Sequence, residues 1–206
     1  MWTVILIAML FSGPIRAIAA AGLVKDGPAR GELWRWVTAS FLHLGGFHLM
    51  FNASAALAWA PLIEALCGRA TLGLVYFSSV VGGSICSLLL LPGTPSVGAS
   101  GGLMGLLGFL VVLGYRGRDH LPYGFARRMI TSVGFIAFFG LALLHFIDNA
   151  AHAGGLLTGA VLGFWLAPSD PSVQPCEGPV LRAVGYGAWG LLVAGGVLAL
   201  LKVLGA

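Results

Sequence analysis

Charged side chains are what this sequence has least of. Only 9% of its 206 residues are Asp, Glu, Lys or Arg, whereas 58% are hydrophobic. Soluble globular domains carry about 25% charged residues, so this composition excludes an ordinary soluble protein. The mean hydropathy of +0.96 points the same way. We therefore expect a protein whose main solvent is the lipid bilayer.

Cysteine pairs, metal-ligand spacings and basic runs are missing as well. The three cysteines, Cys67, Cys86 and Cys176, have no paired or ligand-like spacing, so we interpret them as structural. The net charge of +4 is modest, and no run of Lys and Arg indicates nucleic acid as a partner. No motif indicates a cofactor or a metal ion, and we expect neither.

Long apolar stretches, in contrast, run through most of the chain. A spanning helix needs about 20 apolar residues, so there is room for about seven such helices. The 32 glycines suit membrane helices that pack closely. The first stretch has no leading basic region, so we interpret it as a retained helix rather than a signal peptide. The predicted spans are 2–22, 47–66, 70–91, 100–115, 128–147, 150–167 and 181–203.

Arginines predict the orientation of these spans. Arg116, Arg118, Arg127 and Arg128 flank the connection between the fourth and fifth spans. The positive-inside rule puts that connection in the cytoplasm, so the amino terminus lies inside and the carboxyl terminus outside. The segment 23–46 then faces outside. Because it is apolar and contains tryptophans, which prefer the membrane interface, we expect it to lie in the outer leaflet.

Two polar residues stand at the mouths of apolar stretches. Ser100 lies within Val97–Gly102, and His152 lies within Asp148–Gly155. Polar groups at bilayer depth are costly, so each is a candidate functional residue. Taken alone, each is explained as readily by packing or by an interfacial position. Together they predict an intramembrane serine protease, because a histidine base can activate a serine hydroxyl and later protonate the leaving amine. Asp148, one turn before the histidine, is not assigned as a third catalytic member.

A third polar residue, Asn52, is expected at the same depth in the membrane as Ser100 and His152. Ser100, His152 and Asn52 stand 16 to 18 residues before the charged residues that mark the inner ends of their spans. At about 1.5 Å per residue, all three lie roughly 24–27 Å from the cytoplasmic edge. That depth is just below the outer edge of a hydrocarbon core about 30 Å thick. His48 lies one turn above Asn52 on the same helix face.

Glycines predict that the serine and histidine helices touch. Gly155 and Gly159 give the helix of His152 a smooth face, and Gly101 and Gly105 form a similar strip on the helix that Ser100 begins. Small residues let two backbones approach closely in a membrane. A direct hydrogen bond between the serine and the histidine requires that approach.

Acyl transfer also needs donors for the oxyanion. We expect His48, the Asn52 amide and the backbone N–H of Ser100 to supply them. Gly98 lets the chain turn sharply and admits the substrate backbone. As an alternative, His48 and Asn52 form a hydrogen-bonded pair between helices. His43 is expected to brace the outer loop.

The order of these motifs resembles the rhomboid family of intramembrane serine proteases. The resemblance covers about residues 32–165, which is most of the chain. One position departs from the family pattern, because Met104 stands where the family often has a tyrosine one turn after the serine. The matching segments are Glu32–Arg35, His43, His48–Asn52, Glu64, Gly68, Gly98–Gly101, Ala151–Gly155 and Gly159.

The resemblance implies an all-α polytopic membrane protein. Its six-helix core would occupy residues 1–168 with the loop 23–46, and a short cytoplasmic linker and a seventh helix would occupy 169–206. Ser100 would be the nucleophile and His152 the base, with the oxyanion bound by His48, Asn52 and the Ser100 amide. Substrates would be single-span membrane proteins, cut near the outer face.

Three alternatives stay open at this point. A non-proteolytic rhomboid relative would bind or escort transmembrane clients, although such proteins lose the nucleophile or the base. A transporter would spread polar groups through the whole depth of the membrane and often repeat its halves, and neither pattern is found here. The rhombosortase branch is neither assigned nor excluded. The expected location is a bacterial inner membrane, with the lipid bilayer and transmembrane substrates as partners; the oligomeric state is open.

Overall fold

The computed structural model describes residues 1–27, 30–143, 147–171 and 177–206, so Cys176 lies outside the described residues. Within these ranges the chain is helical, and its β-structure is a single antiparallel bridge between Leu23 and Ser96. The predicted all-α polytopic fold is confirmed. The elements are α1 (Trp2–Ser12), α2 (Pro14–Ala21), α3 (Arg35–Thr38), η2 (Ala39–Phe41), α4 (Gly46–Cys67), α5 (Arg69–Leu90), α6 (Ser100–Arg116), α7 (Phe125–Ala142), α8 (Asn149–Leu166) and α9 (Pro179–Leu204).

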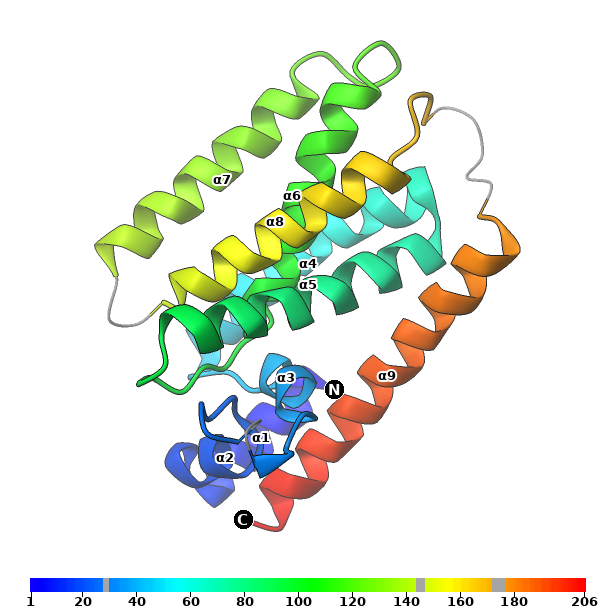
Figure 1. Ribbon diagram of the computed structural model, residues 1–206. Helices are drawn as coiled ribbons and strands as arrows, with labels where there is room; N and C mark the ends of the chain where they lie inside the picture. Colours follow the sequence, from blue (N-terminus) through cyan, green and yellow to red (C-terminus); the bar gives the residue numbers. More distant parts are fainter. Residues whose placement is uncertain (28–29, 144–146, 172–176) are drawn as a thin grey trace.

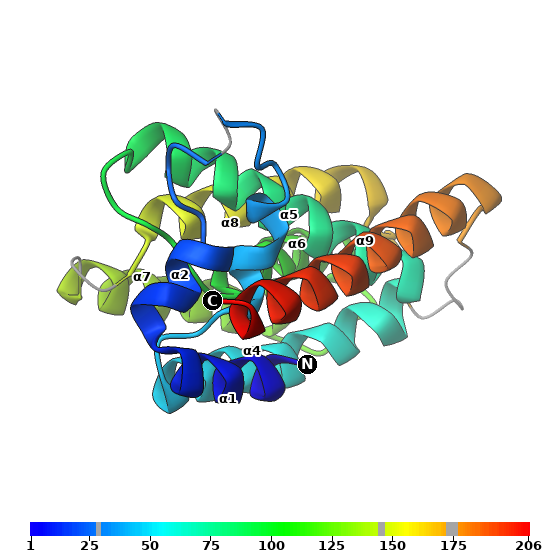
Figure 2. The same ribbon diagram turned by 90° about the horizontal axis from the view of Figure 1, so that it is seen from below.

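Helix α6 is the centre of the bundle. It packs against α4, α5, α7 and α8, and most of its residues are buried. Helix α7 lies on the outside of the bundle, whereas α9 packs against α5 and crosses it at an angle (Figure 1). The short helices α1 to α3 gather at one end, beside the carboxyl-terminal part of α9 (Figures 1 and 2).

Among the described helices, α4, α5, α7 and α9 are long and apolar enough to cross a membrane on their own. Helix α6 is also apolar but has only 17 residues, against 22 in each of α4 and α5. At about 1.5 Å per residue, α6 is roughly 25 Å long, which is shorter than a hydrocarbon core of about 30 Å. The first residue of α6 can therefore lie below the membrane surface.

The prediction of one continuous helix over 2–22 is wrong. The chain breaks at Gly13, which has a φ of 88°, and α2 starts with Pro14 at its first position. Proline disfavours helical geometry in the residue before it and suits the first turn of a new helix. The 11 residues of α1 reach only about 16 Å, too short to span the bilayer.

The described residues of the segment 23–46, which are 23–27 and 30–46, form a packed cap rather than a linker. It contains α3 and η2, which contact α5, α6 and α9. Arg35, only 5% exposed, donates from Nε to Glu32 Oε2 at 2.7 Å and from Nη1 to the Gly22 carbonyl at 2.8 Å. Thr38 Oγ1 donates to the Ala21 carbonyl at 2.7 Å. These bonds tie the cap to the end of α2.

Candidate active site

Ser100 is held at the start of α6 by the backbone that precedes it. Leu23 and Ser96 exchange two backbone hydrogen bonds of 3.0 and 3.1 Å, and Gly98 N–H donates to the Ala39 carbonyl at 2.9 Å. Gly98 has a φ of 125°, a conformation that residues with side chains rarely adopt. The cap therefore fixes the turn that delivers Ser100 to the amino-terminal end of α6, where backbone N–H groups lack partners within the helix.

His48 presents a hydrogen-bond donor to this turn. Its Nδ1 accepts a bond from the Leu44 N–H at 3.2 Å, so the proton of the neutral imidazole sits on Nε2. Nε2 lies 2.8 Å from the point that a Cβ on Gly98 would occupy, and Ser100 Oγ lies 3.8 Å from the same point. The imidazole and the serine hydroxyl thus face one small space, which any side chain at position 98 would fill.

Asn52 lies one turn below His48 and is 5% exposed. Its Nδ2 donates to the His48 carbonyl at 2.8 Å, within α4 itself. The alternative of a His48–Asn52 pair bonded to another helix finds no support among the described hydrogen bonds. An amide nitrogen carries two N–H groups, so this bond commits one of them.

Helices α6 and α8 pack directly, with no helix between them. A Cβ on Gly155 would lie 1.9 Å from the Gly101 carbonyl oxygen, and one on Gly159 would lie 1.8 Å from that of Gly105. Only glycine permits such contact, so the predicted approach of the two glycine strips is confirmed. His152 is the fourth residue of α8, at the same end of the bundle as Ser100.

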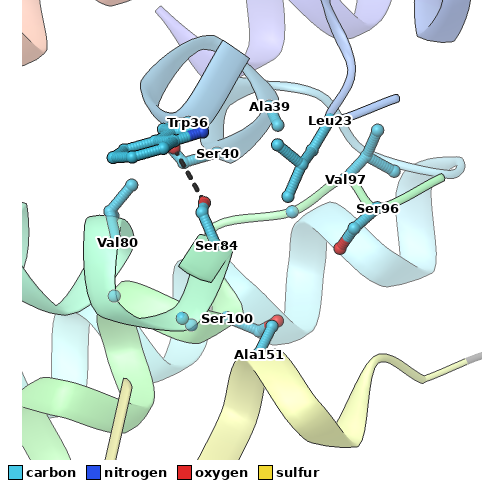
Figure 3. A pocket seen from close by; sticks show the side chains of 14 residues that line it. Leu23, Trp36, Ala39, Ser40, Val80, Ser84, Ser96, Val97, Ser100 and Ala151 are labelled. Atoms are coloured by element: carbon cyan, nitrogen blue, oxygen red, sulfur yellow. Dashed lines mark hydrogen bonds between the residues drawn. The ribbon is translucent and has the colours of Figure 1, made fainter. Parts of the chain in front are cut away.

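The amino-terminal turns of α6 and α8 come together at this end. The Ala151 carbonyl oxygen lies 3.5 Å from the Cβ position of Gly101, and Ala151 lines the same cavity as Ser100 (Figure 3). Among the described residues, Ser100 and His152 form no hydrogen bond with each other. In free enzymes such bonds are often long and shorten when substrate binds.

The cavity beside Ser100 is small and partly polar. Its volume is about 30 Å³, enough for roughly one water molecule. Four serine residues line it, and Ser84 Oγ donates to the Trp36 carbonyl at 3.0 Å (Figure 3). A site with this lining suits water rather than a large apolar group. The four serines are Ser40, Ser84, Ser96 and Ser100.

His43 is almost fully buried in the cap, at 1% exposure, with its ring edge-on to Trp2 and His48. Burial, with a smaller contribution from His48, lowers the pKa of His43 from 6.5 to about 4. Between these values the unfolded chain binds a proton that the folded chain does not. The folded state should therefore lose stability as the pH falls from 6.5 towards 4.

The variant His43→Phe tests this expectation, because phenylalanine keeps an aromatic ring but cannot titrate. The thermal unfolding midpoint of the wild type should fall between pH 7 and pH 5. In His43→Phe that fall should be smaller, whatever the absolute stability of the variant. An equal fall in both proteins would assign the pH dependence to other groups.

Two sets of hydrogen bonds at the site were not predicted from the sequence. The backbone bonds between the cap and residues 96–98 join positions far apart in the chain, and no side-chain pattern encodes them. Asp148, noted only for its spacing, is the N-cap of α8 and accepts a bond from the Ala151 N–H at 2.8 Å. An aspartate four residues before the histidine was a capping signal that the sequence did carry.

Comparisons of the sequence with known proteins point to one family. A sequence model of the Rhomboid domain matches residues 30–169. RHOMBOID-like protein 6, mitochondrial, from Arabidopsis thaliana is 42% identical over 137 residues, covering 66% of this chain and 44% of that protein. Rhomboid protease GluP from Bacillus subtilis is 35% identical over 131 residues, covering 64% and 25%. Rhomboid-type serine protease 2 from Emericella nidulans is 32% identical over 158 residues, covering 74% and 31%. This chain thus spans less than half the length of these relatives.

Proposed function

Because the chain belongs to the rhomboid family, we propose that it is an intramembrane serine endopeptidase that cleaves single-span membrane proteins. Ser100 is the proposed nucleophile and His152 the proposed base. The observation that carries the proposal is the direct packing of α6 on α8, which brings the first turns of both helices to one cavity. The position of the His48 imidazole beside Gly98 also supports the proposal.

The proposed reaction follows from these positions. His152 takes the proton of Ser100 Oγ as the oxygen attacks the carbonyl carbon of the scissile peptide bond. The oxyanion receives hydrogen bonds from His48 Nε2, Asn52 Nδ2 and the backbone N–H of Ser100. His152 then protonates the leaving amine as the C–N bond breaks, so the amine departs and the acyl group remains on Ser100 as an ester. A water molecule deprotonated by His152 attacks this ester, releases the acid and restores the serine.

The proposed membrane placement rests on the two ends of α6. Ser100 begins this helix, and Arg116 closes it at the opposite end. The chain is an integral multi-pass membrane protein. With the arginine-rich end inside, the site opens towards the outer face. We assign a bacterial inner membrane, although relatives in plants and fungi also match.

The variant Asn52→Ala should slow cleavage by roughly a hundredfold, because it removes one of three oxyanion donors. The loss should appear in kcat, since the oxyanion forms only after the attack. Asn52 also bonds within α4, so the thermal midpoint of the variant must be measured beside its kinetics. Full activity in Asn52→Ala, with His152→Ala inactive, would remove Asn52 from the oxyanion site.

The competing function is a non-proteolytic rhomboid-like protein that binds or escorts transmembrane clients. Such a protein needs neither a nucleophile nor a base, yet this chain has a serine and a histidine in the first turns of α6 and α8, two helices that pack directly on each other. Binding of a reporter without its cleavage by the purified wild-type protein would favour this second function.

A further inference from the structure

A chain of three polar side chains joins the cap to the start of α8. Lys25 Nζ donates to Ser87 Oγ, and Ser87 Oγ donates to Asp148 Oδ2. Lys25 lies in the segment 23–46, Ser87 in the last turn of α5, and Asp148 immediately before α8. Ser87 is fully buried, so its hydroxyl depends on these two partners.

Asp148 is also hydrogen-bonded to the first turn of α8, the helix that carries His152. Its second oxygen, Oδ1, accepts a bond from the Ala151 N–H at 2.8 Å, and its backbone carbonyl accepts one from the His152 N–H at 3.1 Å. The residue therefore holds the backbone of His152 and of the residue before it. Both carboxylate oxygens are engaged, so the carboxylate has a defined orientation.

The charge of Asp148 also acts on the proposed base. The amino-terminal end of a helix carries a partial positive charge, which opposes an imidazolium in its first turn. His152 must become an imidazolium when it takes the serine proton. The Asp148 carboxylate stands one turn before His152 and is linked through Ser87 to Lys25, and its negative charge offsets the field of the helix end.

We propose that Asp148, oriented by Ser87 and Lys25, is a positioning residue that fixes His152 and stabilises its protonated form during proton transfer. The proposal rests on the proposed protease function. It extends that function by coupling the outer cap to the catalytic base through a buried hydroxyl. Asp148 does not touch the substrate and acts only through His152.

The variant Asp148→Asn separates charge from capping. Asparagine caps a helix about as well as aspartate, so the thermal midpoint should stay close to the wild-type value. Without the charge, kcat should fall by about tenfold while KM stays within twofold. The rate at which a fluorophosphonate labels Ser100 should fall by a similar factor, because that reaction needs the same proton transfer. An unchanged kcat and labelling rate would overturn the proposal.

Two further variants test the connection itself. Ser87→Ala and Lys25→Met each break the chain, and each should lower kcat by several-fold without a matching rise in KM. The double variant that combines Lys25→Met with Asp148→Asn should lose little more kcat than Asp148→Asn alone, because both substitutions act on the same carboxylate. Lys25→Arg, which keeps the positive charge, should have a kcat close to that of the wild type. Full additivity, or no rescue by arginine, would show that Lys25 does not act through Asp148.

Asp26→Asn is the matched control, because Asp26 is an exposed acid in the same cap whose partner is Arg30. Asp26→Asn should leave kcat and the labelling rate unchanged. A fall in these rates equal to that in Asp148→Asn would attribute the effect to net charge. The two proposals fail in different ways. A wild-type protein that neither cleaves nor is labelled contradicts the protease function, whereas an active wild type with a fully active Asp148→Asn contradicts the positioning role alone.

Discussion

Replacing Ser100 by alanine is expected to abolish cleavage of a transmembrane reporter while the protein still folds. The substitution removes the attacking oxygen, and losing a catalytic serine lowers kcat by roughly 10⁴-fold or more in other serine proteases. Ser100 Oγ forms no hydrogen bond among the described interactions, so its loss should leave the helix packing intact. The assay uses purified protein and a single-span reporter with a helix-breaking, small-residue cleavage site.

His152→Ala should be as inactive as Ser100→Ala, and the double variant should be no worse than either, because the two residues act as a unit. The thermal midpoint of each variant, measured in the same detergent, controls for misfolding. Cleavage by a folded Ser100→Ala protein at a rate near that of the wild type would remove Ser100 from the mechanism.

Adding a methyl group at the contact between α6 and α8 should reduce both stability and activity, and this is the second largest effect that we predict. In Gly159→Ala the new Cβ would lie 1.8 Å from the Gly105 carbonyl oxygen, a distance that forces the two helices apart. Overpacking of this kind costs about 1–3 kcal/mol. Because the same contact brings the first turns of α6 and α8 together, we expect Gly159→Ala to lower both the thermal midpoint and the cleavage rate.

The matched control is Gly134→Ala, since Gly134 lies within α7 and a Cβ there would meet no atom within 4 Å. Alanine in an open helical position is favoured over glycine by about 0.5–1 kcal/mol. This variant should therefore be as stable as the wild type or slightly more stable. If Gly159→Ala behaved like Gly134→Ala, the close packing of α6 on α8 would be refuted.

The fold could be predicted where apolar runs are long and uninterrupted. The predicted span 47–66 became α4 (46–67), and 70–91 became α5 (69–90), because continuous apolar stretches leave the backbone no alternative to helix in lipid. The break at Gly13 was missed because the apolar character of the chain continues on both sides of it. A glycine followed by Pro14 is a local backbone signal, and it outweighed the apolar character of its neighbours.

For the candidate site, the contact between the two helices could be predicted from the sequence, but the bonds that hold it in place could not. Glycine spacing predicted the contact of α6 with α8, since only a helix without side chains on one face allows it. The Gly98–Ala39 bond and the Lys25–Ser87–Asp148 chain depend on how the cap folds over the bundle. These contacts join residues dozens of positions apart, so no local pattern specifies them.

The most direct measurement is covalent labelling of the purified wild-type protein with a fluorophosphonate, followed by mass spectrometry of the modified peptide. Such probes react with a serine only when a base activates its hydroxyl. We expect a single adduct on Ser100 in the wild type and none in His152→Ala. A probe that leaves Ser100 unmodified, or that labels it equally in His152→Ala, would contradict a serine nucleophile activated by the neighbouring histidine.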